Sequence, residues 1–304
     1  MSNTAGYKHP HYAESLSEFG FPRELPYCGG WIIERQIPGY SDRDAMGCYP
    51  LFSCQRWSLL SEDFRLLQPE CVSLALVADP FGNYELGELK SCFDVVLPFK
   101  QHYVIDLNSS IEKQVSHHHQ RYAAKALNEV RVEPVENPFA ALDEWSMLYS
   151  HLVKKHRITG IQAFSKASFA RQLDVPGMTA FRASAGRSTV GMLLWYVDGE
   201  VGYYHLGASS DEGYARRASF GLFWTSIQHF KACGLAWLDL GAGAGLQDLA
   251  EDGLGQFKKG WSTLSKPAYF CGRIFNPEKY LEITKAKSDL STSYFPAYRK
   301  GEFN

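Results

Sequence analysis

The stretch Tyr203–Trp224, "YYHLGASSDEGYARRASFGLFW", changes character twice and decides how the second half of the chain is understood. It opens as a β-strand, continues as a polar loop that carries Arg216 and Arg217, and ends as an apolar helix. The first N–H groups of a helix lack partners and lie at the positive end of its dipole, so they favour phosphate. Arg216, Ser219 and Gly221 therefore predict an anion site at this helix start. The alternative is that Ser219 is an ordinary N-cap and the arginines are surface charge.

The composition is that of a globular protein without a strong charge bias. The 304 residues are 45% hydrophobic and carry a formal net charge of −2, which provides no broad basic field for DNA or a membrane surface. No run approaches the roughly 18 apolar residues of a membrane span, and residues 1–15 lack the apolar core of a signal peptide. Seven scattered cysteines without a CxxC motif predict free thiols. We therefore expect a cytoplasmic protein without membrane insertion.

Three consecutive histidines, His117–His119, are the most conspicuous local feature. The sequence around them, "SSIEKQVSHHHQRYAAKAL", predicts one helix with Ser109 and Glu112 as a capping box. Successive helix residues point about 100° apart, so three in a row cannot grip one metal ion, and we predict no metal. A basic stripe at four-residue spacing consists of Lys113, His117, Arg121 and Lys125. It is either a solvated face or the lining of a groove that attracts an anionic substrate.

The hydrophobic pattern predicts an α/β protein with two halves. Residues 1–30 are expected to be irregular, whereas strand-like runs such as "WIIERQI" and "CVSLALVADP" follow, with helical sequence between them. After residue 128 the predicted order is β-α-α-β-β-β-α-β-α-β, which favours a mixed sheet. We expect domains at 1–127 and 128–285 and a C-terminal tail at 286–304.

Three segments of the second half carry a resemblance to a known group of enzymes. They are "YYHLGA" with the arginine-bearing loop, "GLAWLDLGAG" and "GLGQFKKGW". With the strand order, they make residues 128–275 similar to the GNAT acyltransferase superfamily. Within it the chain most resembles the Fem-type branch, whose founding members transfer amino acids from charged tRNA to peptidoglycan precursors. The branch's Gly-Leu, Phe-Lys, aromatic signature matches Gly253, Leu254, Phe257, Lys258 and Trp261.

The resemblance implies a GNAT fold in the C-terminal half and a degenerate GNAT-like α/β half at the N-terminus. GNAT proteins bind the pyrophosphate of coenzyme A through a loop written Arg/Gln-x-x-Gly-x-Gly/Ala, with Ser219 here at the first glycine position. In that fold two parallel strands part and admit the acyl-pantetheine arm, next to the backbone of Leu206 and Gly207. The implied binding residues are Leu206, Gly207, Arg216, Arg217, Ser219, Phe220 and Gly221.

Three side chains are candidates for the chemistry of acyl transfer. His205 could move a proton near neutral pH, and Asp239 could accept a proton or orient the acceptor. Lys258 matches the lysine that the Fem-type branch uses near the reacting centre, where its charge could stabilise an oxyanion. The alternatives are a core histidine at 205, a backbone-capping carboxylate at 239 and a solvated lysine at 258.

The predicted function is N-acyl transfer from acetyl-CoA or another acyl-CoA to a small amine or a peptidoglycan or polysaccharide precursor. The alternative donor is aminoacyl-tRNA, as in the Fem-type branch. It is less favoured because the chain has a slightly negative net charge and no lysine-rich helical arm. A third hypothesis is a non-catalytic GNAT-like protein that binds a ligand, since fold does not fix function.

Overall fold

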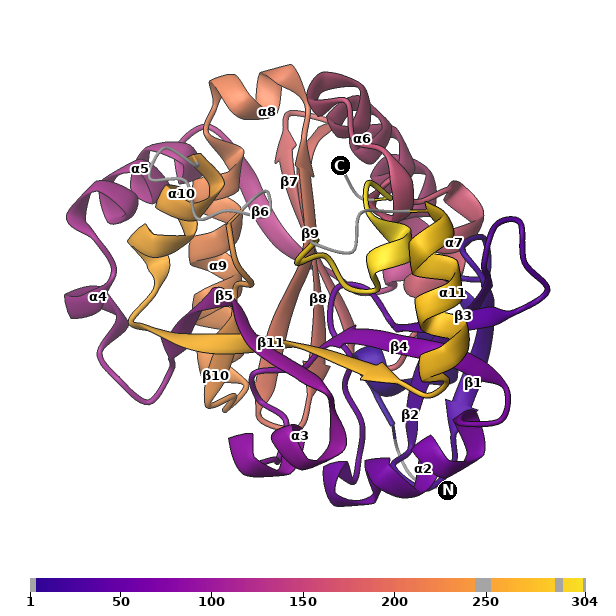
Figure 1. Cartoon of the computed structure of the whole chain (residues 1–304). Helices are drawn as coiled ribbons and strands as arrows, with labels where there is room; N and C mark the ends of the chain where they lie inside the picture. The colour runs from indigo at the N-terminus through magenta and orange to yellow at the C-terminus, as the bar shows by residue number, and fades with distance from the viewer. Residues whose placement is uncertain (1–3, 244–252, 288–291, 303–304) are drawn as a thin grey trace. The chain divides into compact units, whose positions relative to one another are not determined.

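The computed structural model describes residues 4–243, 253–287 and 292–302, which divide into two compact units (Figure 1). Unit 1 contains the described residues of Met1–Gly6 and Lys100–Lys266, and unit 2 those of Tyr7–Phe99 and Pro267–Asn304. The chain passes between the units within β5 (Val95–Asp106) and β11 (Leu264–Ile274). These limits differ from the ranges expected from sequence, because residues 100–127 pair and pack within unit 1.

Unit 1 is built on a mixed sheet, and the predicted fold class is confirmed. Its strands lie in the order β5-β10-β9-β8-β7-β6, with β9 and β10 parallel and the pairs β5–β10, β9–β8, β8–β7 and β7–β6 antiparallel. The bounds are β6 (Arg131–Val135), β7 (Met178–Ala185), β8 (Ser188–Asp198), β9 (Val201–Ser209) and β10 (Trp237–Asp239).

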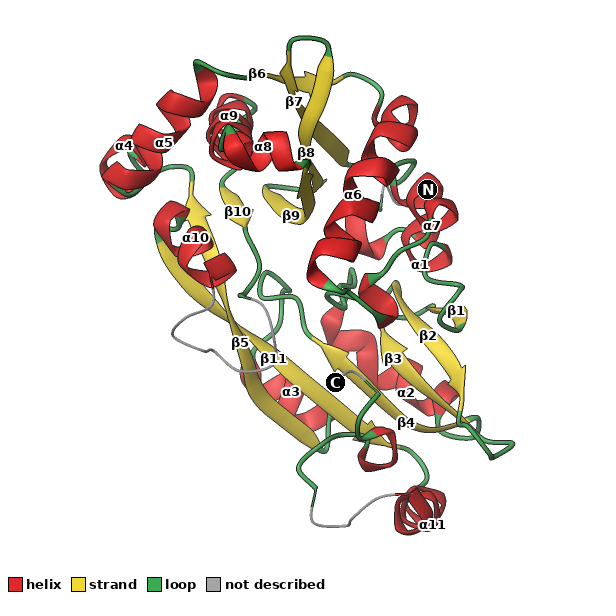
Figure 2. Cartoon of the chain, turned by 90° about the horizontal axis from the view of Figure 1, so that it is seen from above, coloured by secondary structure: helices red, strands yellow, loops and turns green. Residues whose placement is uncertain are grey.

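Helices cover both faces of this sheet. Figure 2 shows α9 and α6 on opposite sides of β7, β8 and β9, in agreement with their contacts to these strands. The apolar core on the α9 side includes Trp195, Phe223 and Leu238, all buried. The helices of unit 1 are α4 (Ile111–Gln114), α5 (His117–Leu127), α6 (Leu142–His156), α7 (Lys166–Gln172), α8 (Asp211–Ala215), α9 (Ala218–Ala232) and α10 (Gly253–Trp261).

The helix starts follow the sequence signals in most places. The Asn137 side chain accepts from the N–H groups of Phe139 and Ala140 before α6, as its N-cap position predicts. The expected single helix over the histidines is wrong, because the chain breaks between α4 and α5. Ser116 is the N-cap of α5 and accepts from the N–H of His119, so the second helix starts anew there. The short helix α8 lies where a polar loop was expected.

Parallel strands β9 and β10 separate soon after they meet. They pair from Val201 opposite Trp237 to Tyr203 opposite Asp239. Beyond that point β9 runs on to Ser209, and the described residues show no further pairing between the two strands. Leu240 turns instead to β5, where its N–H donates to the Tyr103 carbonyl. The two strands separate after the pair of Tyr203 and Asp239. We call this point of separation the fork.

Unit 2 has its own α/β arrangement. The strand order is β1-β2-β3-β4-β11, with β3 and β4 parallel and the other neighbours antiparallel. Sequence reasoning missed β1, which contains Pro22 and forms the edge, where a residue without an N–H is tolerated. The bounds are β1 (Phe21–Leu25), β2 (Gly30–Gln36), β3 (Arg43–Gly47), β4 (Cys71–Val77), α1 (Pro10–Glu14), α2 (Leu60–Leu67), α3 (Leu86–Cys92) and α11 (Pro277–Lys287).

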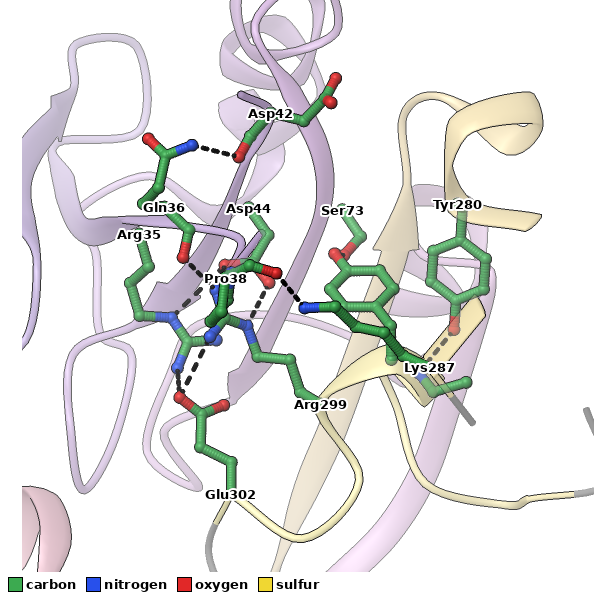
Figure 3. Close-up of polar contacts among 12 residues, drawn as sticks. Arg35, Gln36, Pro38, Asp42, Asp44, Ser73, Tyr280, Lys287, Arg299 and Glu302 are labelled. Atoms are coloured by element: carbon green, nitrogen blue, oxygen red, sulfur yellow. Dashed lines mark hydrogen bonds and ion pairs between the residues drawn. The ribbon is translucent and has the colours of Figure 1, made fainter. Parts of the chain in front are cut away.

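A buried ion pair joins the C-terminal part of unit 2 to its sheet (Figure 3). Arg299 donates from Nε and Nη2 to the two carboxylate oxygens of Asp44, at 2.6 and 2.8 Å, and from Nη2 to the Gln36 carbonyl. Asp44 on β3 is fully buried, and Arg35 lies 3.4 Å from it. Glu302 pairs with both arginines at the rim. The segment around Arg299 thereby completes the polar interior of the unit.

Substitution Arg299→Met tests this pair. It keeps much of the aliphatic bulk but leaves the Asp44 carboxylate buried beside a single arginine, so the free energy of unfolding should fall by about 3 kcal/mol. Urea denaturation of the purified protein measures the change. Lys300→Met, at an exposed neighbouring position, should stay within about 0.5 kcal/mol of the parent. Equal stability of both variants would contradict a structural role for the pair.

No helix in the described part of the chain is long and apolar enough to cross a membrane.

Candidate active site at the fork

The fork is lined by backbone on β9 and by side chains from the helices on the α9 side. Leu206 and Gly207 pair with β8 at one edge, opposite Leu194 and Leu193. A Cβ added at Gly207 would meet the Tyr204 hydroxyl at 2.5 Å and Leu193 at 2.7 Å, so any other residue would displace these side chains. The Tyr204 ring therefore lies directly against the backbone that the resemblance assigns to the thioester.

Lys258 is buried at the fork, which excludes the solvated alternative for its side chain. It projects from α10, is 6% exposed, and donates from Nζ to the Ala242 carbonyl at 2.6 Å. The ammonium also lies 5.4 Å from the centre of the Tyr204 ring, within the range of a cation–π contact. A Cβ on Gly241 would come within 3.3 Å of Nζ. The charge is thus held where β10 ends.

Helix α10 is held in place by the start of α5. The Ser116 N–H donates to the Gly260 carbonyl, and Nε2 of His119 donates to the Phe257 carbonyl at 2.9 Å. Nδ1 of His119 accepts from the Ser116 hydroxyl at 2.8 Å. Burial lowers the pKa of His119, which favours the neutral ring that these bonds require. A Cβ on Gly260 would overlap the His119 ring, so the two helices need glycine there.

The histidine triplet therefore has a structural member that sequence reasoning missed. The ring of His119 packs edge-on against Trp261 and Phe220, with centroids 4.9 and 5.1 Å away. His118 lies against Tyr122 instead, with ring centroids 4.3 Å apart.

Among the described residues no group of three or more histidine, cysteine or acidic side chains could hold a metal ion.

Asp239, the last residue of β10, is paired with a histidine that the sequence did not single out. Its carboxylate is 2% exposed, and both oxygens lie within 3.0 Å of Nδ1 of His102 on β5. One oxygen also accepts from the Gly241 N–H at 2.8 Å. Asp239 therefore caps the local backbone, as one alternative predicted, and it also forms a buried pair with His102.

His205 lies on β9 but is turned toward α7. Its Nε2 is 3.0 Å from the side-chain oxygen of Gln172, and its ring packs beside Tyr196 and Phe164. Burial lowers the pKa of His205 to about 3. An imidazole in this environment is a poor proton acceptor near neutral pH, which favours the core-histidine alternative.

At the start of α9 the two arginines have different surroundings. Arg216 is bonded to Glu212 at 3.0 Å and lies 3.6 Å from Glu129, so two carboxylates already offset its charge. Arg217 has a left-handed backbone, φ 57°, at the N-cap position of α9. Such a conformation is uncommon for a residue other than glycine and marks a position under constraint.

Three cations surround the Tyr122 ring beside the start of α9. The Arg217 guanidinium lies 4.9 Å from the ring centre, and Arg121 and Lys125 from α5 lie 5.5 and 5.7 Å away. Two members of the predicted basic stripe therefore gather with Arg217. We call these three side chains the Tyr122 cluster; its excess positive charge and the free N–H groups of α9 suit a phosphate.

The remaining predicted binding residues divide between surface and core. Ser219 forms no side-chain hydrogen bond within the described residues, which leaves its hydroxyl available at the first turn of α9. Phe220 packs on Phe257, with centroids 5.0 Å apart. Gly221 is buried, and a Cβ there would touch Ala126 of α5 at 3.5 Å, so it serves helix packing. The glycine-rich segment expected at 241–245 lies partly outside the described residues.

Part of the chain matches the model of a known protein family. Residues 114–258 match the family model described as "Acetyltransferase (GNAT) domain", and the observed sheet with its fork has the expected architecture. The resemblance to the GNAT superfamily is confirmed over these residues.

Solved structures with a similar fold span nearly the whole chain. FemX has a TM-score of 0.65 at 14% identity, over 93% of this chain and 96% of that chain. The C-terminal domain of a putative lysylphosphatidylglycerol synthetase from Agrobacterium fabrum has a TM-score of 0.65 at 13% identity, over 93% and 91%. L-PGS from Bacillus licheniformis has 0.60 at 12%, over 90% and 94%. At these identities the likeness concerns the fold. No curated protein sequence matches the chain.

The environment of His205 predicts a pH dependence of stability. Because its folded pKa is lowered to about 3, the unfolded chain binds a proton below about pH 6.5 that the folded protein does not bind. The contribution of His205 is therefore complete above pH 6.5 and is lost as the pH falls toward 3, by about 1.4 kcal/mol per pH unit. His205→Gln keeps a donor for Gln172 and should flatten this acid limb in urea titrations between pH 4 and 7. The exposed His151→Gln serves as control, and an unchanged slope in His205→Gln would contradict the prediction.

Proposed function

We propose that the protein transfers an acyl group from an activated carrier to an amine, with Lys258 at the reacting centre. The observation that carries the proposal is the buried Lys258 ammonium at the fork, which donates to the Ala242 carbonyl at 2.6 Å and lies 5.4 Å from the centre of the Tyr204 ring. A buried charge is costly unless its hydrogen bonds fix it in place, so the position of this ammonium is well defined. An ammonium held where two parallel strands separate can stabilise a negative charge that develops there.

The chemistry follows from what the fork offers. An amine that attacks an ester or thioester carbonyl produces a tetrahedral oxyanion, and preorganised donors stabilise this charge best where water is excluded. Lys258 supplies the positive charge, and the backbone of Leu206 and Gly207 supplies main-chain groups beside it. In this proposal the reaction belongs to unit 1. His205 is not carried forward as a proton carrier, and the GNAT-like character of the N-terminal half stays a prediction.

Acyl-CoA is the donor that the GNAT domain favours. The Tyr122 cluster, the start of α9 and the free Ser219 hydroxyl are suited to its pyrophosphate. Arg216 is less suited than the sequence indicated, since Glu212 and Glu129 hold its side chain. We therefore shift the main binding role to Arg217.

Aminoacyl-tRNA is the second candidate donor. The specific observation in its favour is the match of Lys258 to the Fem-type signature, together with a fold shared with FemX over 93% of this chain. The Tyr122 cluster could bind a tRNA phosphate equally well. The acceptor in either case is a small amine or an amine of a cell-envelope precursor, met in the cytoplasm.

Donor binding can be measured by thermal stabilisation, because a ligand bound only by the native state raises the melting temperature. We expect acetyl-CoA to stabilise the parent protein and Arg217→Asn to weaken its affinity about tenfold or more, through loss of a charge-assisted bond. Asparagine tolerates the left-handed backbone at this position. Arg157→Asn is the matched control, since Arg157 is the other non-glycine residue with positive φ in the described chain.

Each result of this experiment separates the candidates. Stabilisation by a charged tRNA but not by acetyl-CoA would select the second donor. Stabilisation by neither, with a folded protein, would favour the non-catalytic hypothesis. Equal affinities in Arg217→Asn and the parent would remove the Tyr122 cluster from the donor site.

Substitution Lys258→Met tests the reacting centre. It keeps the packing of the aliphatic stem and removes the charge, so kcat should fall by about 10²–10³ with little change in KM. Loss of the bond to Ala242 should lower stability by only about 1 kcal/mol. Lys259→Met is the internal control, because Lys259 is exposed on the next position of α10. Full activity in Lys258→Met would exclude this residue from the mechanism, and equal losses in both variants would indicate a diffuse basic patch.

A further inference from the structure

The buried pair of His102 and Asp239 involves only one of the two nitrogens of the imidazole ring. Nδ1 of His102 lies 2.9 and 3.0 Å from the two carboxylate oxygens of Asp239. A carboxylate accepts, so Nδ1 carries a proton, and in the neutral ring Nε2 then carries a lone pair. Nε2 has no hydrogen-bond partner among the described residues. The ring is thus fixed as a proton acceptor at Nε2.

Strand register places His102 at the fork. Val104 on β5 lies opposite Asp239, so His102, two residues earlier on an antiparallel strand, is level with Gly241. On the other side of β10, Tyr203 is the last residue of β9 to pair, also opposite Asp239. His102 therefore lies one step beyond the last parallel pair, where the two strands separate. Lys258 approaches the same glycine, with Nζ 3.3 Å from the position of a Cβ there.

Two contacts fix the orientation of the Asp239 carboxylate. One of its oxygens accepts from the Gly241 N–H at 2.8 Å, which fixes the carboxylate between the backbone and the imidazole. Main-chain bonds between Tyr103 and the residues Leu240 and Gly241 fix β5 against this segment. Both partners of the pair are buried, so the contact is not an exposed surface pair of small energetic value.

We propose that His102 is the general base of the reaction and that Asp239 is its positioning residue, an inference that rests on the proposed acyl transfer. The acceptor nitrogen attacks the carbonyl carbon, a C–N bond forms, and the proton on nitrogen passes to Nε2 of His102. Collapse of the tetrahedral intermediate breaks the C–S bond of a thioester, or the C–O bond of a tRNA ester. The leaving sulfur or oxygen then takes the proton back from Nε2, so the ring is restored for the next turnover.

In this proposal Lys258 and His102 have different roles in the reaction. The Lys258 ammonium meets the oxyanion, while the imidazole removes the proton from the attacking amine. The base suits an acceptor that must lose a proton as the bond forms, as the amine of the proposed function does.

The protonation state of His102 can be tested without any substrate. We expect nitrogen NMR of the full chain with ¹⁵N-labelled histidine to show His102 protonated at Nδ1 and free at Nε2, with the signal assigned by its absence in His102→Asn. In Asp239→Asn the amide oxygen can keep the bond to Gly241 and turn its NH2 toward Nδ1, so the proton should move to Nε2. A proton on Nε2 in the parent protein would overturn the proposal.

Turnover supplies the second test. Asparagine at position 102 can place an amide N–H where Nδ1 lay, so Asp239 stays bonded while the base is lost. With acetyl-CoA or charged tRNA as donor and a peptidoglycan stem peptide with a free lysine amine as acceptor, kcat should fall about 10²-fold or more. Thermal stabilisation by the donor should remain as in the parent. His151→Asn is the matched control, because it removes an exposed His–Asp pair with Asp211 at 3.2 Å.

The outcomes distinguish this inference from the function on which it rests. An active parent together with an undiminished kcat in His102→Asn would overturn the role of His102 alone. A parent that turns over neither donor would overturn the proposed function and the base with it, whatever the NMR result. A kcat loss in His102→Asn with donor stabilisation intact, beside a normal His151→Asn, would support both.

Discussion

Two hydrogen bonds between α10 and the start of α5 determine where the charge at the fork lies. The Ser116 N–H and Nε2 of His119 bind the Gly260 and Phe257 carbonyls, so the last turns of α10 cannot rotate without leaving buried donors unpaired. Gly260 permits the contact because the His119 ring occupies the space of a side chain. Lys258 projects from these same turns, and its burial at the fork follows from this docking.

Three buried histidines of unit 1 show how one residue type acquires different roles from its partners. Nε2 of His119 faces a backbone carbonyl and that of His205 faces the oxygen of Gln172, so both nitrogens act as donors. His102 instead gives its Nδ1 to Asp239. Only this last arrangement, among the three, leaves Nε2 to accept a proton, because the carboxylate fixes the tautomer. The hydrogen-bond partner therefore determines whether a buried histidine only supports the packing or can also accept a proton.

The two arginines at the start of α9 also differ in their partners. Arg216 and Arg217 are adjacent in sequence, yet the first is bonded to Glu212 while the second lies over Tyr122 beside two other cations. Ion pairing offsets the positive charge of Arg216, whereas within the described part of the chain Arg217 forms no ion pair and its charge is not offset in this way. The binding surface for a phosphorylated donor is therefore formed by residues from α5 and α9 together.

Apart from the short helix α8, the sequence by itself determined the order of elements in the second half, because apolar periodicity and helix caps act over a few residues. Asn137 before α6 is an example. The match of Lys258 to a family signature was likewise visible in the chain. The partner of Asp239 was not: His102 lies 137 residues away, and their contact depends on the antiparallel pairing of β5 with β10. Burial of Lys258 and the unequal roles of the two arginines were also decided by tertiary structure. Solvation and pairing depend on residues brought together across the fold, which no local pattern records.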